Sequence, residues 1–382
     1  MFAAQYWGSR DIDSMENVFG YTMKVTLIVS TFFFLVGLCI PDILMSLFTN
    51  DTALIAHGSL YLRAVSVSFL LTGISQIYLC TLKNSGKVSI AGSISSVCVV
   101  INIILNAVFI FGLLGFPKMG IAGAALATVI ARLAEVMWCI FVTARKSQVK
   151  LHLKKIITCN KELRSDFWKH TAPVLGNEIV WGIGFTMYSV IMGHLGSDAA
   201  AANAIANIAK NLVACFCLGL GSGSGIIIGN ELGAGRLDSA REYGSKLCKL
   251  SIICGAVSGV FLLLLIPFVL MLTDLSPQAN TLLKGMLVMC SYYLIGKSVN
   301  STTIAGIFCA GGDSKFGFLC DTVTIWCVTV PLGFLAAFLF HLPVLTVYFV
   351  INLDEIIKLP AVYRHYKKYL WVKNLTVKEK SK

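Results

Sequence analysis

The segment Leu250–Thr273 reads LSIICGAVSGVFLLLLIPFVLMLT and holds no charged side chain in 24 residues. A helix needs about 20 consecutive apolar residues to cross the hydrocarbon core of a bilayer. Lipid offers no partner to unpaired backbone groups, so a segment of this kind must be a helix rather than an open strand. This stretch therefore predicts an α-helix that crosses a membrane.

The same pattern recurs along the chain, and its breaks carry the Gly, Pro, Asn and Asp residues that are typical of loops. The composition agrees: 57% of the residues are apolar and 13% are charged, against about 25% charged in an ordinary soluble domain. We expect an all-α membrane protein with ten spans. These cover residues 20–47, 53–81, 89–114, 120–143, 172–195, 200–230, 247–273, 281–309, 316–340 and 344–362.

Basic residues are distributed unevenly between the two sides of these spans. The loops and tails on one side hold 23 Lys and Arg residues, whereas those on the other side hold only Lys118. The positive-inside rule then predicts that both termini face the cytoplasm. Topology and contact with anionic membrane lipid explain the net charge of +12, so no nucleic-acid partner is expected.

The two halves of the chain resemble each other. Gln5-Tyr-Trp-Gly8 matches Asn230-Glu-Leu-Gly233 at an offset of 225 residues, and Pro41 matches Pro267 at an offset of 226. A steady offset indicates an internal duplication, here of two bundles with the same orientation in the membrane. The second half has two helices before Asn230, whereas the first half has only four residues before the matching Gln5. The offset therefore predicts that about 60 residues, one helix and most of a second, are missing before the first half. The chain would then hold ten of an expected twelve spans.

These features predict four parts. They are a truncated N-terminal bundle in residues 1–144, a basic cytoplasmic linker in 145–170 that lies on the inner leaflet, a C-terminal bundle in 171–364 and a basic cytoplasmic tail in 365–382. No HExxH, GxSxG or P-loop motif occurs, so neither enzymatic activity nor a cofactor is expected.

Glu178 is the first candidate site residue. It lies inside an apolar span, where an ionised carboxylate costs about 2.5–3.5 kcal/mol or more unless it is solvated or paired. Trp181, Phe185 and Ser189 fall on the same helical face and predict a shared cavity. In that cavity Glu178 would bind a coupling cation or proton and the charged group of a substrate. The alternative is a carboxylate that is satisfied by a structural lysine.

Lys297 is the second candidate, near the middle of the span 281–309. At a rise of 1.5 Å per residue it lies within about 5 Å of Glu178 in depth. If the two side chains meet, the ammonium group takes the place of a free cation. A Na⁺ ion at Glu178 and proton coupling through a Glu178–Lys297 pair therefore both remain open, with Asn300 as a further polar group of the coupling site and no metal site certain.

A polar stripe runs along the next span. Asn203, Asn207, Lys210 and Asn211 follow an i, i+4, i+7, i+8 pattern, and a stripe of that width is costly against lipid. These side chains should line either the bundle interior or a wet cavity. Packing and a role in the substrate pathway are both open.

Glycines also recur in this span. Gly221, Gly225, Gly229 and Gly233 stand four residues apart, so they share one face of a helix. This pattern is typical of close helix–helix contact and permits bending.

Several ordered motifs resemble the bacterial branch of the multidrug and toxin extrusion (MATE) family. They are Ala4-Gln-Tyr-Trp-Gly8, Pro173-Val-Leu-Gly-Asn-Glu178-Ile-Val-Trp181, Gly193-His-Leu-Gly196 with Ala201-Ala-Asn-Ala-Ile205, Gly229-Asn-Glu-Leu-Gly-Ala-Gly235, Gly306 through Ala310-Gly-Gly-Asp313, and Trp371-Val-Lys-Asn-Leu-Thr376.

The resemblance implies a V-shaped antiporter of two pseudo-symmetric bundles in the bacterial inner membrane. Such a protein, expected as a monomer, would expel amphiphilic and often cationic small molecules in exchange for Na⁺ or H⁺. The family's NorM-like branch has a glutamate at the position of Glu178. It also has an aspartate in the helix of Lys297, where Ser298 is the closest register in this chain. The alternatives are a lipid-linked precursor flippase of the same superfamily and an inactive truncated remnant.

Overall fold

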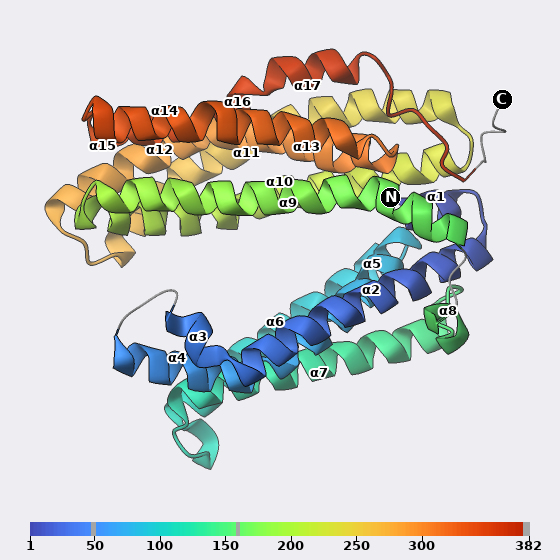
Figure 1. Ribbon diagram of the computed structural model, residues 1–382, viewed down its shortest axis with the longest axis horizontal. Helices are drawn as coiled ribbons and strands as arrows, with labels where there is room; N and C mark the ends of the chain where they lie inside the picture. The colour runs from blue at the N-terminus through green and yellow to red at the C-terminus, as the bar shows by residue number, and fades with distance from the viewer. Residues whose placement is uncertain (47–50, 158–160, 377–382) are drawn as a thin grey trace. The chain divides into compact units, whose positions relative to one another are not determined.

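The computed structural model describes residues 1–46, 51–157 and 161–376. The chain forms two compact units, one of Arg10–Arg164 and a larger one that joins Met1–Ser9 to Ser165–Lys382. Within the described residues every regular element is helical, as Figure 1 shows, so the all-α prediction is confirmed. Parts of the predicted linker (158–160) and tail (377–382) lie outside these residues.

The smaller unit is a bundle of membrane-length helices. Asp11 caps its first long helix by accepting a hydrogen bond from the Ser14 backbone N–H at 3.0 Å. Its elements are α2 (Ile12–Cys39), α3 (Pro41–Ser46), α4 (Thr52–Val65), α5 (Val67–Asn84), α6 (Val88–Phe111), the short η1 (Leu113–Gly115), α7 (Gly120–Lys146) and α8 (Leu153–Ile157).

Two features of this unit lie within spans that the sequence predicts. The expected span over 53–81 is divided, since α4 and α5 meet at Ser66 with a bend of 44°. The one carboxylate of α7, Glu135, is buried and accepts hydrogen bonds from Arg132 at 2.7 Å and from the Ser75 hydroxyl at 2.9 Å. The acid inside this apolar bundle is therefore neutralised locally.

The predicted interfacial linker takes a different form. Helix α7 continues to Lys146, α9 already begins at Lys161, and only the five-residue α8 lies between them. Lys155 of α8 binds Asp13 at 2.6 Å and Glu16 at 2.9 Å, both on α2. Burial lowers the pKa of Lys155, but the bonds to these carboxylates outweigh it and raise the pKa overall. The described part of the linker is therefore not one continuous helix, and these ion pairs hold α8 against α2, while its position on the inner leaflet stays a prediction.

The larger unit contains the remaining helices. Two of its described spans include turns of π-helix, a form that is rare and often lies at functional sites. Its elements are α1 (Phe2–Gly8), α9 (Lys161–His194), α10 (Ser197–Gly233), α11 (Leu237–Leu272), α12 (Pro277–Asn300), η2 (Ser301–Phe308), α13 (Ser314–Thr322), η3 (Val323–Thr329), α14 (Val330–Phe334), η4 (Leu335–Leu339), α15 (Val344–Ile351), α16 (Asp354–Ile357) and α17 (Leu359–Tyr366).

Helix α1 packs against the end of α10 through glycines. A Cβ atom on Gly8 would collide with the backbone of Asn230, and a Cβ atom on Gly233 would collide with the backbone of Gln5. The two contacts are reciprocal, since the sequence offset of 225 matches Gln5 to Asn230 and Gly8 to Gly233. Each half of the chain thus contributes the same pair of positions to one crossing.

The C-terminal tail is packed rather than free as far as Thr376. Trp371 is fully buried, and Gln5 donates from Nε2 to the carbonyl oxygens of Ala310 (2.7 Å) and Lys373 (3.1 Å). The compact units therefore differ from the predicted boundaries at both ends, because residues 1–9 and the described part of the tail belong to the larger unit.

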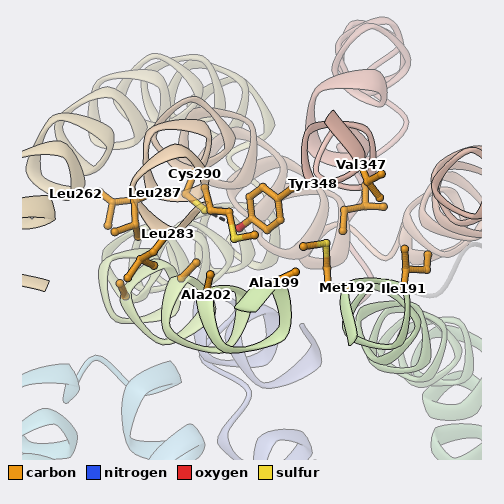
Figure 2. Packing of buried hydrophobic residues seen from close by; sticks show 14 of the residues in the cluster. Ile191, Met192, Ala199, Ala202, Leu262, Leu283, Leu287, Cys290, Val347 and Tyr348 are labelled. Atoms are coloured by element: carbon orange, nitrogen blue, oxygen red, sulfur yellow. Dashed lines mark hydrogen bonds between the residues drawn. The ribbon is translucent and has the colours of Figure 1, made fainter. Parts of the chain in front are cut away.

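The core of the larger unit lies where α9, α10, α11, α12 and α15 meet (Figure 2). Small residues on α10, among them Ala199 and Ala202, let the neighbouring helices approach closely. Tyr348 of α15 reaches Cys290 of α12 with a hydrogen bond of 3.0 Å. This core holds α15 in place directly before the charged residues that follow it.

The expected continuous span over 344–362 is wrong. It consists of α15, α16 and α17, which are separated at Asn352–Leu353 and at Lys358. Pro360 cannot donate a backbone hydrogen bond, and the buried Asp354 and Glu355 stand at the first break. In the part of the chain that the structure describes, eight helices are long and apolar enough to cross a membrane, or nine with the bent α4–α5 pair, instead of ten.

Candidate functional site: a charged cavity in the larger unit

A cavity of about 240 Å³ lies in the larger unit, between α9, α10, α12, η2, α13 and the broken last span. Four of the residues predicted from the sequence share its wall, namely Glu178, Trp181, Lys297 and Asn300. The lining consists of Asn177, Glu178, Trp181, Leu218, Lys297, Asn300, Ser301, Ile304, Ala305, Asp321, Glu355 and Lys358.

Glycines on α10 bring η2 to this position. A Cβ atom on Gly221 would collide with Ser301, and Gly225 faces the backbone of Gly306. The expectation of close helix contact along the glycine stripe is therefore confirmed. The close approach places Asn300, at the junction of α12 and η2, on the cavity wall.

Lys297 has a different partner from the one considered in the sequence. Its ammonium group donates to the Glu355 carboxylate at 3.2 Å and lies 4.7 Å from the centroid of the Trp181 ring. No ion pair among the described residues joins it to Glu178. Lys297 and Glu178 lie at a similar depth and line the same cavity, but they form no ion pair with each other.

A second lysine completes a buried network. Lys358 binds Asp321 at 2.7 Å and Glu355 at 3.1 Å, and all three side chains are almost fully buried. Asn300 donates from Nδ2 to the Glu355 side chain and to its backbone carbonyl, both at 2.7 Å. Two lysines thus neutralise two carboxylates. Asp321 was not identified from the sequence as a member of this network. A lone acid inside the apolar span 316–340 is nevertheless a signal for a functional or paired residue.

Glu178 is the exception among the three carboxylates of the wall. Its side chain is exposed, and it takes part in none of the ion pairs of the described residues. The amide oxygens of Asn177 and Asn300 are buried there without a hydrogen-bond partner. Glu178 also lines an adjoining cavity of about 270 Å³ with His170. The arrangement offers oxygen acceptors to a cation or a hydrogen-bond donor.

Phe185 and Ser189 share the helical face of Glu178, as predicted, but do not line the cavity. The Phe185 ring stacks on Trp181 with centroids 5.4 Å apart and planes 19° apart. The exposed Ser189 hydroxyl donates to the Phe185 carbonyl at 3.4 Å. Together the two rings form one aromatic surface beside Glu178.

The polar stripe of α10 lies away from the cavity wall. Asn207 donates to Asn203 at 3.2 Å, Lys210 is buried, and Asn211 is exposed. The Lys210 ammonium group lies 3.4 Å from the side-chain oxygen of Asn352 and faces the rings of Tyr293 and Phe185. These contacts are interior packing, and a role of the stripe in a substrate pathway stays a prediction.

Comparison with known proteins agrees with this architecture. The family model MatE matches residues 1–108 and 173–335. The chain is 23% identical to the uncharacterized transporter YisQ of Bacillus subtilis over 97% of its length and 81% of the relative. It is 24% identical to the probable multidrug resistance protein NorM of Halalkalibacterium halodurans, over 87% of this chain and 73% of the relative.

Solved structures share the fold. An outward-facing multidrug resistance MATE family transporter superposes with a TM-score of 0.87 at 16% identity, over 97% of this chain and 82% of the other. A MOP superfamily transporter from Pyrococcus furiosus, described by a binding pocket of reverse polarity, gives a TM-score of 0.86 at 17% identity, over the same shares. The matched family model and the membrane-length helices identify the chain as a member of the MatE family of multi-pass membrane transporters.

Proposed function

We propose that this transporter exports amphiphilic, positively charged small molecules in exchange for Na⁺ or H⁺, from a plasma membrane in which both termini face the cytoplasm. One observation carries this proposal: Glu178 is a carboxylate in the cavity wall that has no lysine partner among the described residues. NorM of Halalkalibacterium halodurans, a probable multidrug resistance protein, supports the substrate class.

The neighbouring residues suit a flat organic cation. The stacked Trp181 and Phe185 rings provide an aromatic face, and such faces attract cations. The unpartnered amide oxygens of Asn177 and Asn300 accept hydrogen bonds from the substrate. Coupling follows if substrate and driving ion compete for Glu178, because the entry of one then lowers the affinity for the other by the same factor in both directions.

A flippase for a lipid-linked pyrophosphate is less well supported. That substrate carries several negative charges and needs cations that are free to bind phosphate. Both lysines of the cavity wall, Lys297 and Lys358, are already bound to carboxylates. The cavity therefore favours a positively charged cargo.

We expect Glu178→Gln to lower export strongly. In proteoliposomes loaded with ethidium, the initial efflux rate should fall about 10-fold or more, since a coupling free energy of about 1–3 kcal/mol corresponds to roughly 5- to 150-fold. Asp238→Asn, a change of a fully exposed carboxylate, is the matched control and should keep the original rate. Efflux by Glu178→Gln at the unmodified rate would remove this residue from the mechanism. No export by the unmodified chain would instead support an inactive protein.

A second prediction concerns the driving ion. Lys297 is a cation fixed in the cavity, so it occupies space that a Na⁺ ion would need. In Lys297→Met, Glu355 keeps Lys358 but loses one neutralising group, and ethidium efflux should become stimulated by Na⁺. The control is Lys284→Met, an exposed lysine on the same helix. An unchanged ion dependence in Lys297→Met would show that this lysine does not take the place of a free cation.

A further inference from the structure

Asp354 is a buried acid beside the cavity that the proposed exchange at Glu178 does not use. It is the first residue of α16, only 3% exposed, and is not part of the cavity wall. Its Oδ1 atom is buried without a hydrogen-bond partner. Asp354 also takes part in no ion pair of the described residues, whereas the adjacent Glu355 binds two lysines.

The cations near Asp354 are directed elsewhere. Lys358 stands four residues later but binds Asp321 and Glu355, and Lys297 binds Glu355. Lys210 of α10 contacts Asn352 instead. Besides the adjacent Glu355, the other titratable groups around Asp354 include phenols, and the Tyr292 hydroxyl has no hydrogen-bond partner. The groups that interact electrostatically with Asp354 include Tyr188 on α9, Lys210 on α10, Tyr292, Tyr293 and Lys297 on α12, Glu355 on α16 and Lys358 before α17.

An ionised carboxylate in this position would be buried with no ion pair among the described residues and no hydrogen bond to Oδ1, which is unfavourable, whereas a protonated one is neutral. We infer that Asp354 holds a proton in this conformation and is the residue that exchanges H⁺ during transport. This inference rests on the proposed antiport and names H⁺ as its driving ion. It replaces direct competition at Glu178 by coupling between two sites: the exposed Glu178 binds the substrate, the buried Asp354 carries the proton, and Lys297 connects them.

The position of Asp354 connects its protonation to the cavity. Loss of the proton places a second negative charge next to Glu355, and the two acids then compete for Lys297. That lysine lies over Trp181 on the cavity wall, so its movement changes the substrate site. The break between α15 and α16 gives the backbone freedom to respond, as discontinuous helices do at transporter ion sites.

Infrared spectroscopy of the reconstituted full chain tests the protonation directly. The carbonyl band of a protonated carboxylic acid should be present at mildly acidic pH, and Asp354→Asn should remove it. Glu178→Gln and the exposed control Asp238→Asn should keep it. The same band in Asp354→Asn would overturn the inference, whether or not the protein exports anything.

A transport measurement then separates the inference from the proposed function. In Asp354→Asn, ethidium export driven by a pH gradient should fall about 10-fold or more, whereas exchange of ethidium down its own gradient should persist. Glu178→Gln should lose both activities, because it removes the substrate-binding carboxylate. Export driven by a pH gradient at the unmodified rate in Asp354→Asn would contradict the assignment of the proton to this residue.

Discussion

Replacing Lys358 with Met is expected to lower the free energy of unfolding of the larger unit by about 3–5 kcal/mol, since removing one member of a buried ion pair leaves its partner as an uncompensated charge. Lys358 is 3% exposed and binds Asp321 at 2.7 Å and Glu355 at 3.1 Å. Glu355 keeps Lys297, so most of the loss comes from Asp321. Unfolding in mixed detergent micelles, followed by tryptophan fluorescence, measures the change.

Two further variants identify the cause of that loss. Lys367→Met removes an exposed lysine and should leave the unfolding free energy within about 0.5 kcal/mol of the unmodified value. Adding Asp321→Asn to Lys358→Met should restore part of the stability, because the orphaned carboxylate is then gone. A double variant that is less stable than Lys358→Met would show that lost packing, and not unpaired charge, dominates.

The long helices of this fold were predictable because apolar length is a local property. Uncharged runs such as Leu250–Thr273 specify a membrane-length helix without reference to the rest of the chain. The breaks were not predictable in the same way. Ser66 and Asn352 interrupt runs that remain apolar overall, and their effect depends on the polar groups that the fold places beside them.

Four residues of the candidate site could be predicted from the sequence, but their pairing could not. Glu178 and Lys297, for which the sequence predicts a similar depth, both line the cavity. The partner of Lys297, however, is Glu355, which the predicted continuous last helix did not bring to the cavity. Asp321 completes the network from a third helix, and a single sequence holds no signal for which of several buried acids a lysine will bind. Pairing is decided by tertiary packing.

The crossing of α1 and α10 gives the second large effect, through Gly233→Val. A Cβ atom at Gly233 would collide with the backbone of Gln5, which no side-chain rotation relieves, so α1 must move. Overpacking of this kind costs about 1–3 kcal/mol and occasionally more. Gln5 also binds the backbone of Ala310 and Lys373, and displacement of α1 therefore loosens the packed tail as well.

Gly219 of the same helix provides the matched control for this crossing. It has open space where its Cβ would stand, so Gly219→Val changes helix propensity and side-chain size without a collision. The thermal midpoint of Gly233→Val in detergent should lie several degrees below that of Gly219→Val, and limited proteolysis should cut the tail near Trp371 only in the former. Equal midpoints for the two variants would mean that α1 does not pack here. A lower midpoint with an uncut tail would mean that the tail is held without Gln5. A lower midpoint together with a cut tail would show that the crossing of α1 and α10 holds both α1 and the C-terminal tail on the larger unit. The two halves of the chain contribute matching positions to this crossing.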